Sequence, residues 1–468
     1  MNWKKLAHNY QAQMIQDLTT LVAINSANDP KQETTEFPLG PGPAHALQQM
    51  LAFGERDGFI TKNVDQLGGH IQYGTGDEIL GIFGHMDTVP AGEGWNSDPF
   101  LLTNVDGQLF GRGALDDKGP SLAAYYALRI LKDQNIKPSK TIRLIFGTDE
   151  ENQWRGINHY LEVEPLPDLG FSPDGEFPVI NGEKGIVSYQ LQFPIAATTG
   201  DQVLMSFQAG LRPNMVPQSA TCVVQTLDSS ELVNHYNYYL KQHPQIQGNA
   251  LIQDQAVTLT LVGQGCHAME PENGYNAATF LADFLADQRF DDQAQAYLQF
   301  IQTKLHLDFT GTKLGLAYQD ETMGALSQSP DIFQYDQTNS GNIVINVRYP
   351  KGHTAGELQE QYQQSLPING NVTAAEHAQE PHYVSDSDPL VSELLKAYRT
   401  QTNDLTSQPM TVGGGTYGRL LNRGVAFGAL MPDGPNVMHQ ANEYITIDNL
   451  LQATAIYADA LWRLTKNK

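Results

Sequence analysis

Basic residues are scarce in this sequence. Only 28 Lys and Arg stand against 52 Asp and Glu among 468 residues, which gives a formal net charge of -24 at pH 7. No run of lysines or arginines interrupts the acidic excess. A field of this sign repels nucleic-acid phosphates and anionic lipid surfaces, so we expect neither a nucleic acid nor a membrane as partner. The same field tolerates divalent cations.

Cysteine and long apolar runs are scarce as well. Cys222 and Cys266 could form only one bridge, too few to stabilise a chain of this length, which indicates a reducing compartment. We expect both to be buried small hydrophobic residues. The apolar residues near the N-terminus are spaced as on an amphipathic helix and are interrupted by Asp17. A signal peptide needs an unbroken apolar core and a membrane span needs about 20 apolar residues, so we expect a cytoplasmic protein.

What the sequence does contain is ample material for hydrophobic cores, since 40% of the residues are hydrophobic. A single core stops growing at roughly 250 to 300 residues, so we expect at least two domains. Over residues 1–185, short apolar runs such as "ILGIFG" and "TIRLIFG" alternate with helical patterns, among them the crossover helix "GPSLAAYYALRILKDQN". This alternation predicts an α/β domain with a mostly parallel sheet and helices on both faces.

The pattern changes at about residue 186. The segments "GIVSYQLQF", "AVTLTLVGQG" and "GNIVINVRYP" alternate apolar and polar residues, which is typical of strands half exposed to solvent. We therefore expect an α+β domain over residues 186–381, inserted into the α/β domain, which resumes over residues 382–468. There "GVAFGAL" is expected to form a buried strand and "DNLLQATAIYADALWRL" a final helix capped by Asp448.

Residues with useful chemistry follow the apolar runs. In open α/β sheets, ligands bind beyond the carboxyl ends of the strands, so the side chains found there are the candidates. They are His85 and Asp87 after "ILGIFG", Glu150 and Glu151 after "TIRLIFGTD", Asp174 after "LGFSP", Asp116 and Asp117 in "GRGALDDKGP", and His439 in "NVMHQANE". We expect these side chains to gather at one edge of the sheet.

Such a gathering of imidazoles and carboxylates would be strongly repulsive unless cations neutralised it. Histidine suits Zn²⁺, whereas a site for Mg²⁺ or Ca²⁺ would use oxygen ligands almost alone. Two zinc ions sharing a carboxylate, at the roughly 3.5 to 4 Å of two-metal hydrolytic sites, fit best. Taken singly, each pair has an ordinary explanation. His85-x-Asp87 can occur by chance, and Glu150-Glu151 is typical of a solvated surface. Asp116-Asp117 precedes a helix, where carboxylates interact favourably with the positive end of the helix dipole. The prediction depends on their coincidence at strand ends.

The motifs that carry these residues resemble those of the dizinc metallopeptidase family of aminoacylases, carnosinases and glutamate-releasing carboxypeptidases. The segments "GHMDTVPAGEGW", "GRGALDDKGP", "GTDEEN" and "SPDGE" follow one another in the family's order. The resemblance extends to "GQGCHAMEP", "NVRYP" and "GGGTYGRL", and thus over nearly the whole chain. It is closest to the bacterial dipeptidase V type, and it implies a zinc-peptidase-like catalytic domain with an inserted lid domain.

The resemblance also implies a role for each candidate. The implied ligands are His85 and Asp174 for one zinc ion, Glu151 and His439 for the other, and Asp116 as the bridge between them. Glu150 would be the general base, which takes a proton from the metal-bridging water and later gives it to the leaving amine. Asp87 would orient the ring of His85, as the partners of zinc-bound histidines do. Co²⁺ or Mn²⁺ are possible substitutes for zinc.

The lid residues are known only through the resemblance. His267 in "GQGCHAMEP" would stabilise the oxyanion, and Asn214 in "LRPNMVP" and Arg348 in "NVRYP" would hold the substrate, Arg348 by its C-terminal carboxylate. Ordinary explanations stay open, because Arg348 ends a strand where a surface ion pair is common and His267 could cap a turn. The glycine-rich loop would bring its backbone close to the substrate at Gly414, Gly415 and Thr416, or it could be a flexible turn.

Together these implied roles predict a zinc-dependent dipeptidase that hydrolyses unblocked dipeptides through a metal-bridging hydroxide. Small peptides would be its substrates, because lid residues that grip both ends of a peptide limit its length. Two alternatives stay open: an amidohydrolase of the same family that acts on N-acyl amino acids, and a non-catalytic metal-bound protein that binds peptides. The enlarged lid of the dipeptidase V type is associated with monomers, so we expect a monomer.

Overall fold

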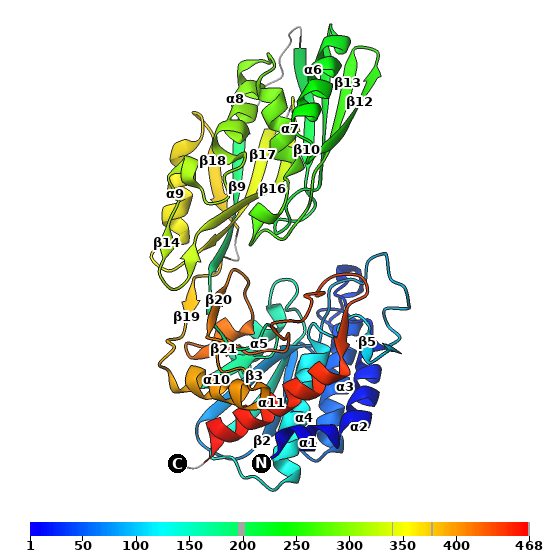
Figure 1. The fold of residues 1–468 in the computed structure, drawn as a ribbon, viewed down its shortest axis with the longest axis vertical. Helices are drawn as coiled ribbons and strands as arrows, with labels where there is room; N and C mark the ends of the chain where they lie inside the picture. The colour runs from blue at the N-terminus through cyan, green and yellow to red at the C-terminus, as the bar shows by residue number, and fades with distance from the viewer. Residues whose placement is uncertain (195–201, 339, 376–377, 467–468) are drawn as a thin grey trace. The chain divides into compact units, whose positions relative to one another are not determined.

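The computed structural model describes residues 1–194, 202–338, 340–375 and 378–466, and the chain divides into two compact units (Figure 1). Unit 1 consists of Met1–Gly182, Tyr383–Met410 and Gly415–Lys468, and unit 2 of Glu183–His382 and Thr411–Gly414. The chain therefore leaves unit 1, builds most of unit 2, and returns. Among the described residues, no helix is both long and apolar enough to cross a membrane.

A mixed sheet forms the centre of unit 1. Within the described ranges it has nine strands, in the order β1 (Ile60–Val64), β2 (Gly68–Tyr73), β6 (Thr141–Gly147), β3 (Ile79–His85), β7 (Leu169–Ser172), β21 (Gly424–Ala426), β8 (Ile180–Glu183) and β19 (His382–Tyr383), with β20 (Met410–Val412) paired to β8. The middle strands β6, β3, β7 and β21 run parallel, whereas β1, β2 and β8 join them in antiparallel pairs. The predicted α/β fold is thus confirmed, and its sheet is parallel in the middle and antiparallel towards its edges.

Helices cover both faces of this sheet. They are α1 (Trp3–His8), α2 (Gln11–Val22), α3 (Pro41–Arg56), α4 (Lys118–Asp133), α5 (Arg155–Val163), α10 (Pro389–Thr402) and α11 (Ile447–Thr465). Successive residues of a strand point to opposite faces. Leu80 and Ile82 of β3 pack in the apolar cluster that contains α4 and α11, whereas Phe83 packs with Ile157 and Tyr160 of α5. The strands of the middle are therefore buried on both sides.

The predicted crossover helix is α4, which packs against β3 and α11. Gly84, near the end of β3, allows the first turn of α4 to lie close to the strand, since a Cβ on Gly84 would lie 1.9 Å from Ser121 Oγ. The final helix α11 is capped by Thr446, whose side chain accepts a hydrogen bond from the backbone N–H of Asn449. The prediction of Asp448 as the cap is wrong, because Asp448 lies in the first turn of α11, where its charge faces the positive end of the helix dipole.

A small three-stranded sheet of unit 1 joins β4 (Thr103–Val105) and β5 (Gln108–Phe110) to β22 (Tyr444–Thr446). Tyr444 pairs with Phe110 and Thr446 with Gln108. This pairing fixes the end of the segment that carries His439 beside the beginning of the loop that carries Asp116.

Unit 2 contains an eight-stranded sheet, counted over the residues that the structure describes. Its strands, in the order of the sheet, are β12 (Gln247–Gln253), β13 (Ala256–Val262), β11 (Ser219–Thr226), β10 (Gln202–Ala209), β16 (Ser327–Asp336), β17 (Ser340–Tyr349), β9 (Gly185–Pro194) and β18 (Asn371–Ala374). All its pairs are antiparallel. A separate two-stranded sheet pairs β14 (Gln319–Asp320) with β15 (Gly324–Ala325).

The helices α6 (Ser229–Gln242), α7 (Ala277–Ala286), α8 (Asp292–Phe300) and α9 (Ala355–Ser365) pack on this sheet, as the upper part of Figure 1 shows. Burial alternates along β9, as predicted for a half-exposed strand. Cys222 lies in the core of unit 2. Cys266 is only partly buried, so the prediction of a buried side chain is wrong there, because Cys266 lies in the loop after β13, whereas Cys222 lies on the buried face of β11.

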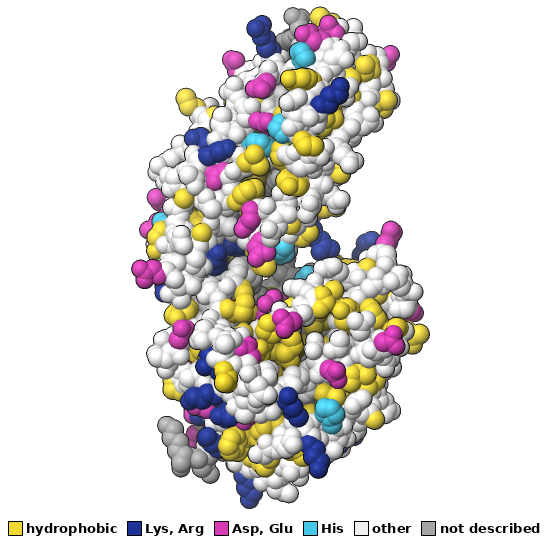
Figure 2. Space-filling model, in the orientation of Figure 1, with side chains coloured by type: hydrophobic (Ala, Val, Ile, Leu, Met, Phe, Trp, Pro, Cys, Tyr) yellow, Lys and Arg dark blue, Asp and Glu magenta, His cyan; other side chains and the backbone are white. Residues whose placement is uncertain are grey.

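Short helical turns complete the two units: η1 (Pro30–Gln32), η2 (Pro271–Asn273), η3 (Ile301–Leu305), η4 (Thr312–Leu314) and η5 (Tyr417–Leu420). On the face drawn in Figure 2, Lys and Arg side chains are scattered among Asp and Glu rather than gathered into one continuous patch. The face in view therefore offers no extended basic surface.

Candidate metal centre

The ends of three neighbouring parallel strands define one edge of the unit 1 sheet. His85 is the last residue of β3, Glu150 and Glu151 follow β6, and Asp174 follows β7. Because β6, β3 and β7 run parallel, their carboxyl ends meet at this edge, as the sequence pattern predicts. Asp116 reaches the edge from the loop before α4.

The side chains at this edge form two groups whose ligand atoms lie within 4.8 Å of one another: His85, Asp116 and Asp174 in the first, and Asp116, Glu151 and His439 in the second. Asp116 belongs to both. Its Oδ1 lies 3.0 Å from His85 Nε2, and its Oδ2 lies 2.8 Å from His439 Nε2. His85 Nε2 is also 3.7 Å from Asp174 Oδ2, and His439 Nε2 is 3.0 Å from Glu151 Oε1. All five predicted ligands are thus brought together around one shared carboxylate.

Asp87 holds three parts of the edge in place. Its backbone carbonyl oxygen lies 3.0 Å from His85 Nδ1, and its Oδ1 lies 3.5 Å from the same nitrogen. Its carboxylate also accepts hydrogen bonds from the backbone N–H of Glu150 and Glu151, each at 3.1 Å. Asp87 thus connects the end of β3 to the segment after β6, a function beyond the ring orientation that the resemblance implies.

Burial and crowding shift the ionisation of these carboxyls. Burial raises the pKa of Glu150 well above its ordinary value, and the charge of Asp174 raises it further. Burial and Asp116 raise the pKa of Glu151 to about 7, although a hydrogen bond to His439 opposes them. Burial lowers the pKa of His439, but hydrogen bonds to Asp116 and Glu151 outweigh it and raise the pKa to about 11. The raised pKa of each of these carboxyls and of His439 means that added positive charge would stabilise this edge, so the donor set fits divalent cations.

The sequence reasoning gave no role to Asp117, which the structure places at the same edge. Its Oδ2 accepts hydrogen bonds from the backbone N–H of His85 at 3.1 Å and from Ser121 Oγ at 2.7 Å. It therefore ties the end of β3 to the first turn of α4. In the sequence, the available signals for this contact were Gly84, which precedes His85, and the pair Asp116-Asp117. Neither signal alone identifies the hydrogen-bond partners of Asp117.

The predicted lid residues all lie in unit 2. The backbone carbonyl of Asn214 accepts a hydrogen bond from Ala268 N at 2.9 Å, so Asn214 is close to His267. His267 Nδ1 accepts a hydrogen bond from Met269 N at 3.1 Å, which is a turn-capping contact. Arg348 is buried on β17 rather than exposed at the surface, with Nε 2.8 Å from Asn346 Oδ1.

The glycine-rich loop meets Arg348, whose Nη1 donates to the carbonyl of Gly413 at 2.9 Å. Gly414 belongs to unit 2, whereas Gly415 and Thr416 belong to unit 1. A Cβ on Gly414 would meet no heavy atom within 4 Å. Thr416 caps η5 by accepting a hydrogen bond from Gly418 N at 3.0 Å. The loop therefore includes a turn before a helix, and there is open space where a side chain of Gly414 would stand.

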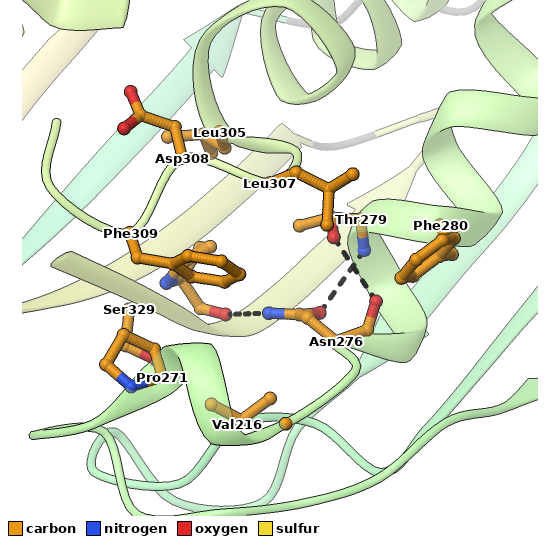
Figure 3. A pocket seen from close by; sticks show the side chains of 12 residues that line it. Val216, Pro271, Asn276, Thr279, Phe280, Leu305, Leu307, Asp308, Phe309 and Ser329 are labelled. Atoms are coloured by element: carbon orange, nitrogen blue, oxygen red, sulfur yellow. Dashed lines mark hydrogen bonds between the residues drawn. The ribbon is translucent and has the colours of Figure 1, made fainter. Parts of the chain in front are cut away.

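A small pocket of unit 2 is lined by residues other than the predicted lid residues (Figure 3). Its lining combines apolar side chains, such as Phe280 and Leu307, with Asn276 and Thr279. Asn276 Nδ2 donates to the carbonyl of Pro330 at 2.7 Å, and Asn276 Oδ1 caps α7 through the backbone N–H of Ala278 and Thr279. Asn276 thus holds the start of α7, while Asp308 Oδ1 accepts a hydrogen bond from Thr312 N and Ser329 Oγ donates to Asp331 Oδ1. The polar side chains of the lining are engaged within the fold, which gives the pocket a structural role.

Comparisons with known proteins agree with this description. The model of "Peptidase family M20/M25/M40" matches residues 81–463. The chain is 43% identical over 469 residues to the Beta-Ala-Xaa dipeptidase of Lactobacillus delbrueckii subsp. lactis, covering 100% of this chain and 99% of the relative.

Two solved structures share the fold at low sequence identity. The dipeptidase Dug1p of Saccharomyces cerevisiae has a TM-score of 0.57 at 13% identity, over 99% of this chain and 98% of that one. Human carnosine dipeptidase 1 has a TM-score of 0.56 at 14% identity, over 99% of both chains. The family match and the full-length relative place the function among metal-dependent peptidases and dipeptidases. This chain belongs to the peptidase family M20/M25/M40.

Proposed function

We propose that the protein is a zinc-dependent dipeptidase that hydrolyses unblocked dipeptides. The observation that carries the proposal is the position of Asp116, with one carboxylate oxygen 3.0 Å from His85 Nε2 and the other 2.8 Å from His439 Nε2. One carboxylate shared by two ligand groups suits two metal ions. A histidine in each group favours zinc over magnesium or calcium, with Co²⁺ and Mn²⁺ as substitutes.

The proposed ligands are His85 and Asp174 for one ion, Glu151 and His439 for the other, and Asp116 for both. Zinc bound there would polarise the scissile carbonyl and make water a stronger acid at neutral pH. Glu150 would accept the proton of the attacking water and donate it to the leaving amine. Burial and the charge of Asp174 raise the pKa of Glu150 above that of an ordinary glutamate, the direction that makes its carboxylate a better proton acceptor. Asp87 supports this role by fixing the backbone of Glu150.

The proposed roles of unit 2 concern the substrate. Arg348 would bind the C-terminal carboxylate with its guanidinium, and Asn214 would hold the substrate beside it. His267 would donate a hydrogen bond to the oxyanion. Gly414, Gly415 and Thr416 would contact the peptide through their backbone. A substrate held at both ends by such groups is short, which favours dipeptides over longer chains.

The experiment that tests this proposal compares matched substrates. Purified protein loaded with zinc is assayed on unblocked dipeptides, including β-Ala-Xaa dipeptides because the relative from Lactobacillus delbrueckii carries that name, and on the same dipeptides with an N-acetyl group. We expect hydrolysis of the unblocked forms. Faster hydrolysis of the acetylated forms would favour the N-acyl amidohydrolase, and tight binding without cleavage would favour a peptide-binding protein.

A further inference from the structure

Glu443 follows His439 in the motif "NVMHQANE", and its side chain is completely buried. Its Oε1 accepts hydrogen bonds from the backbone N–H of Leu115 at 2.8 Å and of Asp116 at 3.1 Å. Its Oε2 accepts hydrogen bonds from Gly113 N at 3.2 Å and from Arg112 Nη1 at 2.5 Å. Each oxygen of this carboxylate therefore receives two N–H groups, and all of them belong to the loop that carries Asp116.

Arg112 is the cation that balances this buried carboxylate, and it is itself 1% exposed. Its Nη2 donates to the carbonyl of Ala91 at 3.2 Å, and its guanidinium lies 5.2 Å from the centre of the Trp95 ring. Ala91 and Trp95 belong to the segment "GHMDTVPAGEGW" that begins beside His85. Arg112 thus joins the loop after β3 to the loop before α4.

Backbone contacts strengthen the same junction. Gly111 N donates to the carbonyl of Glu443 at 3.0 Å. Asn442 Oδ1 accepts a hydrogen bond from Asn96 N at 2.8 Å, and Asn442 Nδ2 donates to the carbonyl of Gly94 at 3.2 Å. Three loops from distant parts of the chain therefore meet at the Arg112–Glu443 ion pair, and each of them either carries a proposed metal ligand or begins directly after one.

We propose that Glu443 and Arg112 are positioning residues that fix the two oxygens of Asp116 between His85 and His439. They contact no reacting atom. They act through the backbone of Leu115 and Asp116, and through the short connection from Glu443 back to His439. This inference rests on the proposed roles of Asp116 and His439 as ligands of two metal ions.

The substitution Glu443→Gln tests this role because of how the hydrogen bonds are divided. An amide has one acceptor oxygen and one NH₂ donor group. In the wild-type protein each oxygen of Glu443 accepts hydrogen bonds from two N–H groups. Whichever way the glutamine amide is turned, its NH₂ would therefore face two N–H donors. The loop would have to move away, and Asp116 would move with it. Glu443→Asp keeps the charge and both acceptors but is shorter, so we expect an intermediate effect.

The measurement is the affinity for Zn²⁺ and Co²⁺, obtained by competition with a chelator of known affinity. We expect Glu443→Gln to weaken metal binding about 10- to 100-fold, the range typical of residues that support metal ligands. At saturating metal, the KM for a dipeptide should stay within about twofold of wild type, because substrate groups are untouched. The visible absorption of bound Co²⁺ should change in Glu443→Gln, which a general loss of stability would not cause in protein that remains folded.

The matched control is Arg423→Gln, which removes another Arg–carboxylate pair of unit 1. Arg423 donates from Nε and Nη2 to Asp388 at 3.0 and 2.9 Å, and neither residue belongs to a loop that carries a proposed ligand. Its metal affinity should equal that of wild type. Wild-type affinity in Glu443→Gln would overturn the positioning role while leaving the proposed function intact. Wild-type protein that binds no metal would overturn both.

If Glu443→Gln does not fold, Glu443→Asp and Arg112→Lys decide the question. Arg112→Lys keeps the positive charge but not the fork that reaches both Glu443 and Ala91. Weaker metal binding in these folded variants supports the proposal, and unchanged affinity in both contradicts it.

Discussion

The two units present their chemistry in different ways, and the difference follows from the direction of their strands. In unit 1 the parallel strands β6, β3 and β7 end at the same edge, so the residues after each strand meet there. In unit 2 all strand pairs are antiparallel, and consecutive strand ends lie at opposite edges. Asn214, His267 and Arg348 accordingly come from two loops and the side of a strand. We infer that unit 1 is the catalytic and metal-binding part, and unit 2 the substrate-binding part.

Among the tests of the difference between the two units, removing the metal should have the largest effect on activity. We expect exhaustive chelation to abolish peptidase activity and added Zn²⁺, Co²⁺ or Mn²⁺ to restore it. Metal binding should also stabilise unit 1 and not unit 2, because a ligand stabilises the folded form that binds it. Trp3, Trp95, Trp154 and Trp462 all lie in unit 1, so tryptophan fluorescence reports its unfolding.

The measurements are activity and the fluorescence melting curve of metal-free and zinc-loaded protein. Circular dichroism, which follows both units, is the control. Full activity in metal-free protein would refute the two-metal proposal.

The next largest effect is expected from Glu150→Gln. It should lower kcat by about 10²- to 10⁴-fold, the usual contribution of a general acid–base group. Metal content should not change, since Glu150 is not a proposed ligand. The control is Glu162→Gln, an exposed glutamate on α5 of the same unit. The measurement is kcat together with metal content, and near-normal turnover in Glu150→Gln would remove it from the mechanism.

A smaller effect is expected in unit 2 from Arg348→Met. Losing a charged hydrogen bond to the substrate carboxylate costs about 1.5 to 3 kcal/mol, which should raise KM about 10- to 100-fold. Metal affinity should stay at the wild-type value. Dipeptides with an amidated C-terminus serve as the control. Because they lack the carboxylate, their KM should change little in Arg348→Met. An equal loss for both kinds of substrate would show that Arg348 does not bind the carboxylate.

The smallest effect concerns stability and pH, and it involves one buried histidine in each unit. Burial lowers the pKa of His70 in unit 1 and of His306 in unit 2 to about 4. Between pH 6.5 and 4 the unfolded chain binds a proton that the folded chain does not, so folding stability falls as the pH decreases through this range. For each histidine the loss from pH 7 to pH 5 is about 2 kcal/mol.

The variants His70→Gln and His306→Gln separate the two units. The free energy of unfolding is measured in urea by tryptophan fluorescence at pH 7 and pH 5. The difference between the two pH values should become smaller in His70→Gln and stay unchanged in His306→Gln. An unchanged pH dependence in His70→Gln would mean that His70 is protonated equally in both states. A change in His306→Gln would mean that the two units unfold together.

The sequence predicts the middle of unit 1 well, because both the strands and the residues after them are local features. "ILGIFG" and "TIRLIFG" correspond to β3 and β6, and the residues after them meet as expected. The contacts of Glu443 could not be predicted, since its partners Gly113 to Asp116 are far away in the chain and no periodic pattern connects them. Asp448 failed as a helix cap because two residues separated only by Ile447, Thr446 and Asp448, both suit the start of a helix, and the side chain of Thr446 makes the capping hydrogen bond.

In unit 2 the strands β9, β13 and β17 could be predicted from their alternation, but the candidate residues could not. An antiparallel sheet gives no rule for where a ligand binds, so Asn214, His267 and Arg348 were found through the resemblance alone. The burial of Arg348 illustrates the point. A strand-ending arginine is usually exposed, and only the three-dimensional contacts with Asn346 and Gly413 reveal that it is held inside the fold.

The division of the ligands along the chain has a consequence for biosynthesis. His85, Asp116 and Asp174, which form one ligand group, all precede unit 2, whereas His439 follows it. At 5 to 20 residues per second, roughly 10 to 50 s pass on the ribosome between the synthesis of Asp174 and that of His439. A nascent chain therefore carries the donors of one site while the other is incomplete, and a truncated chain lacks His439. If the two groups bind metal ions as proposed, a chain that ends before His439 has only one complete ligand group and should not hydrolyse peptides.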